Sequence, residues 1–457
     1  MSAALRHARK QSDWSSKIAA IAVIGGGLAG LTAAIRLAED GADVTLFEAA
    51  PTLGGRTRSF VDRTTGVCCD NGPHLLVGAY HRTIALLQEA TDQTAIHWQP
   101  TLDLPLWAED RGHFHFRPSR WLPFPMALLH AAAALPAHHA DSAIAMLKLA
   151  RAMRGRIEPQ TSVTSWLTPL QIPAALQRDL LEPLCLGAMN EPGSSANAAS
   201  FARVLSESFS CRNHARLGWF TAPLAQALIA PLQQRATALG VQLKLRHRIH
   251  RLDADNSQVH LIGAAEQHAS AARFDAAILA LPAHARDKIL HQPGSATPTS
   301  PITNIHLWYR EPHPLPAPLV GGIGTRGHWF FDLTAMHTAA TGNPTQRSPA
   351  QHICVVISAD TAARDHSALL QQVNRELHAI CHRGNGHTTN SCKPHHYRII
   401  TEQRATALVR PQAPQPPLPA SIIDAAEMPQ PGELPATIEL AVQRGEAAAQ
   451  RARQRFS

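Results

Sequence analysis

The pattern of apolar and polar residues near the start of the chain predicts two parallel strands joined by a helix. Residues 21–24 form a short apolar run that is typical of a buried strand. Residues 28–39 carry apolar side chains at helical spacing on one face, namely Leu31, Ala34, Ile35 and Ala38. Residues 43–48 form a second apolar run. This order of strand, helix and strand is the opening of a doubly wound α/β fold.

The remainder of the chain predicts a helical segment followed by further strands. Residues 101–218 are rich in Ala, Leu and Pro and favour helices. Residues 241–261 return to strand-like alternation, and the stretch 244–251 within them indicates a half-exposed strand. We expect a buried parallel strand at 274–282, because an apolar run there ends at a proline. Other expected elements are strands at 305–309 and 353–358 and a helix at 436–453.

These elements predict one doubly wound, Rossmann-like domain built from discontinuous segments, with a mixed α+β substrate domain between them. The expected nucleotide-binding parts are residues 19–100, 219–290 and 401–457. The expected substrate-domain parts are residues 101–218 and 291–400. Residues 1–18 form a basic extension that lacks the apolar core of a secretory signal.

Charge and cysteine content narrow the classes of partner and compartment. The net charge of +8 comes from scattered basic residues with no nucleic-acid motif, so we expect no nucleic-acid partner. Seven cysteines in 457 residues do not make a disulfide framework, which favours a reducing cytoplasm. The most apolar stretch, 122–137, is interrupted by Pro125 and His130 and is a core or interfacial helix, which leaves open peripheral contact with the inner membrane.

The glycines at the first strand–helix junction predict a diphosphate site. Gly25, Gly27 and Gly30 fit the pattern G-x-G-x-x-G: the first permits a tight turn, the second allows close approach of a diphosphate, and the third lets the helix pack on the strand. The diphosphate then faces the first helical turn, which begins with Leu28 and Ala29. Glu48, at the end of the second strand, is placed to accept hydrogen bonds from ribose hydroxyls.

A second glycine pair follows this acid closely. Gly54 and Gly55 precede Arg56, whose guanidinium can reach the same diphosphate. Together with the first loop, this stretch resembles the opening of the FAD-dependent amine oxidase and carotenoid desaturase superfamily. The resemblance implies FAD as the cofactor.

Further segments resemble a narrower branch, the squalene-associated FAD-dependent desaturases with hydroxysqualene dehydroxylase activity. These segments are 70–74 (DNGPH), 78–80 (GAY), 181–190 (LEPLCLGAMN), 199–208 (ASFARVLSES), 304–309 (NIHLWY), 402–406 (EQRAT) and 434–439 (LPATIE). The resemblance covers most of residues 20–450. It implies cofactor contacts from Ile249 and from Leu434, Ala436 and Thr437.

One segment departs from the family pattern. The family carries a Gly-Asp-Trp-like signature shortly before LPATIE, whereas this chain has IIDAAEMP at 422–429, without glycine or tryptophan. Asp424 or Glu427 would have to supply the acid that meets the cofactor there.

The resemblance implies reduction of hydroxysqualene to squalene for hopanoid synthesis, with the flavin reduced by an external reductant. The leaving hydroxyl needs a proton donor. His74 is the first candidate, with Asp70 either orienting it or capping a turn. Glu182 and Asn190 are pocket candidates. Four apolar residues either line a tunnel for the isoprenoid or belong to the core: Trp121, Phe124, Met126 and Leu128.

Two cysteine motifs give no metal site. The stretch 381–396 contains Cys and His without a CxxC pair, and we predict no metal there. Cys68 and Cys69 are adjacent and are expected to pack as small apolar residues.

Two alternatives to the dehydroxylase remain. The first is an isoprenoid desaturase or an amine oxidase, although amine oxidation favours an aromatic cage and the chain has three tyrosines. The second is a flavin-fold scaffold protein with weakened FAD binding.

Overall fold

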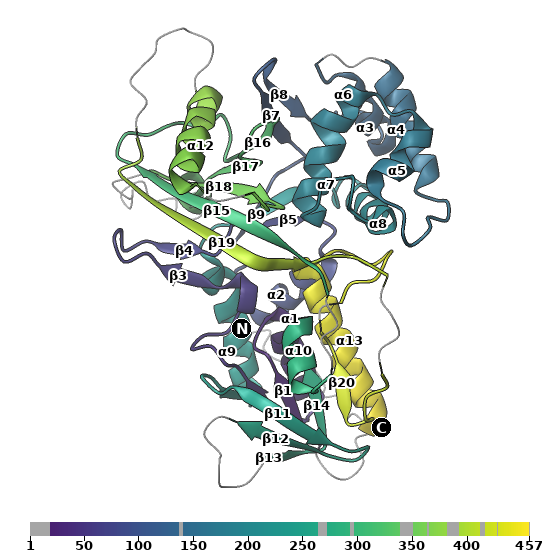
Figure 1. The fold of residues 1–457 in the computed structure, drawn as a ribbon, viewed down its shortest axis with the longest axis vertical. Helices are drawn as coiled ribbons and strands as arrows, with labels where there is room; N and C mark the ends of the chain where they lie inside the picture. The colour runs from purple at the N-terminus through teal and green to yellow at the C-terminus, as the bar shows by residue number, and fades with distance from the viewer. Residues whose placement is uncertain are drawn as a thin grey trace, which may run out of the picture.

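The structure is a computed structural model that describes residues 19–136, 140–263, 272–292, 297–338, 351–362, 365–381, 393–411, 416–426 and 428–456. Its lower part in Figure 1 is built on a parallel sheet of five strands in the order β10-β2-β1-β14-β20. The strands are β10 (Gln242–Lys244), β2 (Asp43–Phe47), β1 (Ala20–Ile24), β14 (Ala276–Leu279) and β20 (Ile422–Asp424), and every pair is parallel. The doubly wound α/β expectation is confirmed.

Both faces of the centre of this sheet are covered, which is why the central strands β1 and β14 are apolar throughout. Ile21 and Val23 point into a core shared with four helices: α1 (Leu28–Glu39), α2 (His81–Ala90), α9 (Ala230–Ala238) and α13 (Ile438–Phe456). Ala22 and Ile24 point to the other face. That face carries the antiparallel strands β11 (Ile249–Ala254), β12 (Val259–Gly263) and β13 (Ala272–Phe274), together with α10 (Ala283–Ile289).

The upper part is built on a mixed sheet of seven strands in the order β19-β15-β18-β17-β16-β7-β8. These are β7 (Leu104–Ala108), β8 (Gly112–Phe116), β15 (Thr299–Tyr309), β16 (Leu319–Ile323), β17 (Trp329–Asp332), β18 (Gln351–Ser358) and β19 (His396–Ala407). One face packs against α12 (His366–Cys381), and α11 (Leu333–Thr338) follows β17. The other face packs against a helical insertion.

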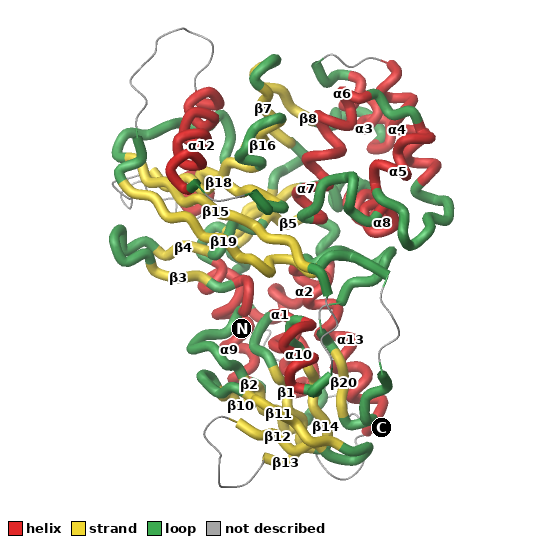
Figure 2. Tube along the Cα trace, viewed as in Figure 1, coloured by secondary structure: helices red, strands yellow, loops and turns green. Residues whose placement is uncertain are grey.

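The helical insertion lies beside this sheet at the upper right of Figure 2. It contains α3 (Phe124–Ala133), α4 (Ala140–Ala152), α5 (Val163–Leu167), α6 (Ala174–Leu176), α7 (Glu182–Met189) and α8 (Ala198–Ser208), with a π-helical turn at Gln177–Leu181. Two small antiparallel units connect the upper and lower parts. They are the hairpin β3 (Ser59–Val61) and β4 (Cys68–Asp70), and the sheet of β5 (Leu75–Val77), β9 (Leu217–Phe220) and β6 (Ile96–Trp98).

Three details differ from the sequence-based expectations. The segment 101–218 begins with β7 and β8, which complete the seven-stranded sheet. The expected boundary at residue 400 falls inside β19. The expected strand at 244–251 is interrupted, because Arg246 adopts a left-handed conformation (φ +55°) and donates its backbone N–H to the carbonyl of Ala50 at 3.0 Å.

Candidate active site

The first glycine loop is a backbone cradle that side chains cannot enter. Gly25 has φ +109°, and a Cβ there would lie 2.3 Å from the carbonyl oxygen of Ala280. A Cβ on Gly30 would lie 1.9 Å from the carbonyl oxygen of Gly25. A Cβ on Gly27 would meet no described atom within 4 Å. Two glycines therefore permit close packing, and the third borders open space at the start of α1.

The N-terminus of α1 offers its N–H groups to that space. No side chain caps the helix, and its first turn, which contains Leu28 and Ala29, carries no acid. Uncapped N–H groups at a helix start bind anions well. The residues therefore fit the diphosphate of a dinucleotide.

Glu48 is fixed beside this loop. Its Oε2 accepts from the backbone N–H of Gly26 at 2.7 Å, and its Oε1 accepts from the N–H of Ala50 at 2.7 Å. A carboxylate has about four acceptor positions, so two remain after these bonds are made. The carboxylate is thus held in place with capacity left for sugar hydroxyls.

The second glycine loop lies against the first. The N–H of Gly54 donates to the carbonyl of Gly26 at 2.8 Å, and a Cβ on Gly55 would lie 3.3 Å from the Cα of Gly27. Arg56, next in the chain, donates from Nη1 to the carbonyl of Ala405 in β19 at 2.7 Å. The structure therefore brings both loops and a guanidinium together between the two large sheets.

The start of α13 lies beyond the start of α1 in the same direction. The carbonyl oxygen of Ala29 would lie 2.3 Å from a Cβ on Gly445 of α13, and Asp40, just past the end of α1, pairs with Arg453 near the end of α13. The two helices are therefore parallel. Ile438 precedes Gly445 by seven residues, so α13 begins about 10 Å further along.

Three residues predicted to contact the cofactor lie at this end of α13. Leu434 is buried, and Ala436 and Thr437 are half-buried. The hydroxyl of Thr437 accepts from the N–H of Leu440 at 3.2 Å and so caps the helix. A second helix start thus lies in line with the first glycine loop.

Two other predicted cofactor residues are engaged elsewhere. The side chain of Ile249 is buried between the parallel sheet and β11–β13, where it lines a cavity of about 350 Å³. The carboxylate of Asp424 accepts from Arg286 at 2.7 Å and from the N–H of Ala426 at 2.8 Å. Glu427 lies outside the described residues. Asp424 therefore has two partners within the protein.

His74 lies where the glycine loops meet the apolar interior. Its Nδ1 is 2.9 Å from the carbonyl oxygen of Gly72. Burial lowers the pKa of His74, and the nearby charge of Arg56 lowers it further. The next residue, Leu75, packs against the large apolar cluster described below.

Asp70 has its own partners. Its Oδ1 accepts from the hydroxyl of Ser59 at 2.5 Å and from the N–H of Leu224 at 2.8 Å. Burial raises its pKa to about 6. The structure gives it a capping role at Leu224, and His74 bonds to Gly72 instead.

The sequence reasoning passed over Asn304. Asn304 lies on β15, and its side-chain amide contacts Gly72. A Cβ added to Gly72 would lie 2.7 Å from Oδ1 of Asn304. This Oδ1 is buried with no hydrogen-bond partner among the described residues. The available signal was the alternation Asn304-x-His306-x-Trp308 in the second half of this strand, which places three side chains with polar atoms on one face.

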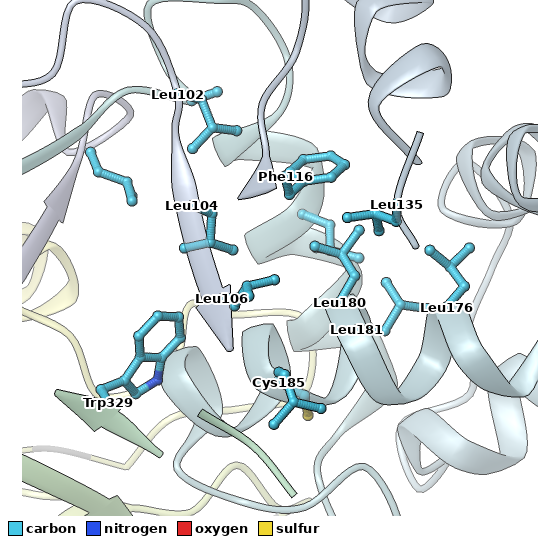
Figure 3. Close-up of a cluster of buried hydrophobic side chains, with 14 of the residues drawn as sticks. Leu102, Leu104, Leu106, Phe116, Leu135, Leu176, Leu180, Leu181, Cys185 and Trp329 are labelled. Atoms are coloured by element: carbon cyan, nitrogen blue, oxygen red, sulfur yellow. The ribbon is translucent and has the colours of Figure 1, made fainter. Parts of the chain in front are cut away.

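A large apolar cluster fills the space between the seven-stranded sheet and the helical insertion (Figure 3). Figure 3 shows Leu104 and Leu106 of the sheet facing Leu180 and Leu181 of the insertion. Phe124 and Leu128 pack against this cluster. A Cβ on Gly187 of α7 would lie 3.3 Å from Nε1 of Trp329, so helix and sheet approach closely here.

The other tunnel and pocket candidates lie outside this cluster's interior. Trp121 is 81% exposed and Met126 is 56% exposed, so neither is a core residue. Glu182 accepts from the N–H of Gly193 at 3.2 Å. Asn190 is buried and bridges the N–H of Ala359 and the hydroxyl of Thr406 at 2.7 and 2.9 Å. Both polar residues therefore hold loops in place.

Two further expectations from the sequence concern membrane-spanning helices and the Cys- and His-containing stretch. Within the described residues no helix is both long and apolar enough to span a membrane. Most of the Cys- and His-containing stretch at 381–396 lies outside the described residues.

Comparisons with known proteins agree with this architecture. The chain is 26% identical to hydroxysqualene dehydroxylase of Zymomonas mobilis subsp. mobilis over 436 residues, covering 93% of this chain and 97% of the relative. It is 29% identical to hydroxysqualene dehydroxylase of Rhodopseudomonas palustris, covering 68% and 72%. The fold is similar to that of cyclohexylamine oxidase from Brevibacterium oxydans, with a TM-score of 0.67, 16% identity and coverage of 96% and 99%.

A family comparison covers nearly all of the structure described above. The model of the flavin-containing amine oxidoreductases matches residues 28–452, from the first helix to the last. The chain therefore belongs to the flavin-containing amine oxidoreductase family.

Proposed function

We propose that this FAD-dependent oxidoreductase is a hydroxysqualene dehydroxylase. The proposed reaction breaks the allylic C–O bond of hydroxysqualene and forms a C–H bond at the same carbon, giving squalene. The hydroxyl leaves as water after it takes up one proton. The substrate gains two electrons as hydride, and an external reductant replaces them.

The cofactor is FAD, and the residues described above fit it. Gly27 and the start of α1 would hold the diphosphate, and Glu48 would hold the ribose. The reduced flavin supplies the hydride in the proposed reaction. Arg56 and the start of α13 are the remaining expected contacts, and Ile249 would act through its backbone because its side chain is buried elsewhere.

One observation carries the proposal: His74 lies between the cofactor loops and the large apolar cluster. Arg56 lies close enough to lower the pKa of His74. On the other side, Leu75 and Val77 pack against the apolar cluster. A hydrocarbon chain lying along this cluster would place its polar end at His74. The surrounding apolar side chains would exclude water from an allylic cation.

His74 is the proposed proton donor, and Asn304 the proposed positioning residue. The buried Oδ1 of Asn304 lacks a partner, and leaving such an acceptor unsatisfied costs about 1–3 kcal/mol. A substrate hydroxyl that donates to Oδ1 would satisfy it. The hydroxyl oxygen would then accept a proton from His74. Asp70 would act indirectly, by holding the β3–β4 hairpin to Leu224.

We further propose that the α3–α4 face of the helical insertion docks on an anionic membrane surface. Of the six large apolar side chains that are strongly exposed in the described residues, four lie here: Trp121, Met126, Ile144 and Leu147. Exposed basic residues accompany them: Arg117, Arg120, Lys148, Arg151, Arg154 and Arg156. Apolar side chains with a basic rim favour anionic lipid headgroups. This surface would collect a substrate that is dissolved in lipid.

Single-turnover assays test the proposed reaction. The FAD-loaded enzyme is reduced with dithionite without oxygen and mixed with hydroxysqualene, and squalene is followed by mass spectrometry. We expect squalene and oxidised flavin in equal amounts. Formation of a more unsaturated isoprenoid by oxidised enzyme would instead favour a desaturase, and oxidation of amines an amine oxidase. A colourless protein that FAD cannot reconstitute would favour the scaffold alternative.

A further inference from the structure

Three buried residues from separate parts of the chain converge on one face of the seven-stranded sheet, the face opposite α12. They are Cys69 on β4, His306 on β15 and His352 on β18. Each offers one ligand atom, and these atoms all lie within 4.8 Å of one another. We propose that Cys69, His306 and His352 bind a divalent metal ion of the zinc class.

The sheet register explains how the three meet. On β15, His306 and Trp308 are two residues apart and therefore share a face. His352 is the cross-strand partner of Trp308 on β18, and the two rings stack at 4.4 Å. Nδ1 of His306 and Nε2 of His352 are 2.9 Å apart. The β3–β4 hairpin then brings Cys69 over the pair.

The separations are close to those of a metal site. Zinc binds thiolate at about 2.3 Å and imidazole at about 2.0–2.1 Å, so tetrahedral ligand atoms lie about 3.3–3.6 Å apart. Binding would require the three side chains to rotate from their present separations, which are 2.9 Å for the histidine pair and at most 4.8 Å overall. Three protein ligands leave the fourth position to water or to another group.

An unsatisfied atom provides independent support. The backbone of Asp70 lies near the His306 ring, yet Nε2 of His306 is buried and has no partner with hydrogen-bonding geometry among the described residues. In a metal site, the second nitrogen of a ligand imidazole usually donates to a backbone carbonyl, a carboxylate or water, and the Asp70 backbone lies near for this. Metal binding lets the two rings rearrange, because the ion replaces the hydrogen bond between them.

The donor set has the chemistry that such an ion requires. Burial lowers the pKa of His306 to about 4 and holds that of His352 well below its usual value, so both rings are neutral ligands. Burial raises the pKa of the Cys69 thiol to about 12, so the thiol is protonated without metal. Metal binding would form the S–metal bond, break the S–H bond and release one proton to solvent.

Nearby charges are compatible with a bound cation. Asp62 lies close enough to influence the pKa of all three residues, and its carboxylate would offset the positive charge of the ion. The positive charge of Arg398 would repel the ion, but this side chain pairs with Asp62 at 3.2 Å. The site would join the β3–β4 hairpin to β15 and β18. The expectation of no metal from sequence considered only local Cys and His spacing, and these ligands are distant in sequence.

Metal content tests the proposal without enzyme turnover, so its outcome is separate from that of the dehydroxylase assay. Protein without a polyhistidine tag is washed with a chelator, incubated with one equivalent of Zn²⁺ and desalted. Zinc is then measured by mass spectrometry. We expect about one zinc per chain in the wild type and at least tenfold less in Cys69→Ser and His352→Gln. Cys185→Ser is the control, because it removes another buried thiol.

Cobalt gives a second readout that does not require a variant to fold. Co²⁺-loaded wild type should show a thiolate-to-cobalt charge-transfer band, and binding should release about one proton per ion. This band should be absent in Cys69→Ser and unchanged in Cys185→Ser. A wild type that retains no zinc and shows no such band would overturn the proposal, as would equal zinc in the wild type and both ligand variants.

Discussion

The guanidinium of Arg286 donates to the carboxylate of Asp424 at 2.7 Å, and the arginine is only 1% exposed. The same guanidinium pairs with Asp287 at 2.8 Å. Two carboxylates, one on α10 and one at the end of β20, therefore share one buried cation. Asp424 stands in the segment that departs from the family pattern, and the structure assigns its carboxylate a partner within the protein.

Loss of this cation should destabilise the fold. Arg286→Met leaves both carboxylates without their shared partner, and breaking a buried ion pair costs about 3–5 kcal/mol. Urea unfolding of the apoprotein measures the loss. The matched control is Arg156→Met, whose exposed pair with Glu158 should contribute less than about 1 kcal/mol. Equal stability of the two variants would contradict the assigned role of Arg286.

Two glycines of the first loop should respond differently to a methyl group. Gly27→Ala places its Cβ in open space, so the apoprotein should keep its melting temperature while FAD affinity falls about tenfold or more. Gly30→Ala places a Cβ 1.9 Å from a backbone oxygen and should prevent stable folding. Thermal unfolding and FAD titration separate the two effects, with Gly155→Ala as the control. Unchanged FAD affinity in Gly27→Ala would place the diphosphate elsewhere.

Asp70 should make stability fall as the pH rises. Its pKa in the folded protein is about 6 and its ordinary value is 3.8, so its stabilising effect is complete below pH 3.8 and is lost as the pH rises through 6. This difference corresponds to about 3 kcal/mol. Asp70→Asn keeps an acceptor for Ser59 and Leu224 without a buried charge. Between pH 4 and pH 7, the free energy of unfolding of this variant should therefore rise relative to that of the wild type, as measured by urea unfolding. Parallel stability curves would contradict this.

His74→Gln should lower the single-turnover rate by about 10²–10⁴-fold at unchanged FAD content, because it removes the proposed proton donor. His97→Gln, an exposed histidine, is the control. The donor must be protonated, so the wild-type rate should fall as the pH rises through a value below 6.5. In Arg56→Met, measured at saturating FAD, this fall in rate should occur at a higher pH, because removing the positive charge raises the pKa of His74. If the rate of Arg56→Met falls at the same pH as that of the wild type, His74 is not the titrating group.

Membrane docking should depend on the exposed apolar residues of the α3–α4 face. Trp121→Ser with Met126→Ser should reduce cosedimentation with vesicles containing anionic lipid by at least tenfold, since each side chain contributes about 1.5–3 kcal/mol when buried. Tyr397→Ser removes another exposed ring outside this face and is the control. Binding that is equal for the two variants, or that persists with neutral vesicles at high salt, would contradict the proposed surface.

Local patterns in the sequence were sufficient for the start of the fold. The helix at 28–39 matches α1 at both ends, and the predicted strand at 43–48 contains β2. Most residues of both elements are buried, so their patterns of apolar residues are strong. The Gly25 and Gly30 positions follow from close backbone approach, which only glycine allows. The seven-stranded sheet was harder to predict, because β7 pairs with β16, where Leu106 lies opposite Gly321, 215 residues later in the chain.

Sequence alone indicated the doubly wound fold, the glycine loop and the acid beside it, because the unit that identifies them, β1–α1–β2, is continuous in the chain. Tertiary structure decided which polar groups meet. It paired Asp424 with Arg286, placed Asn304 against Gly72, brought Cys69 to two histidines, and turned Trp121 and Met126 outward. Such contacts depend on strand register and on the packing of distant segments, and residue spacing carries no information about either.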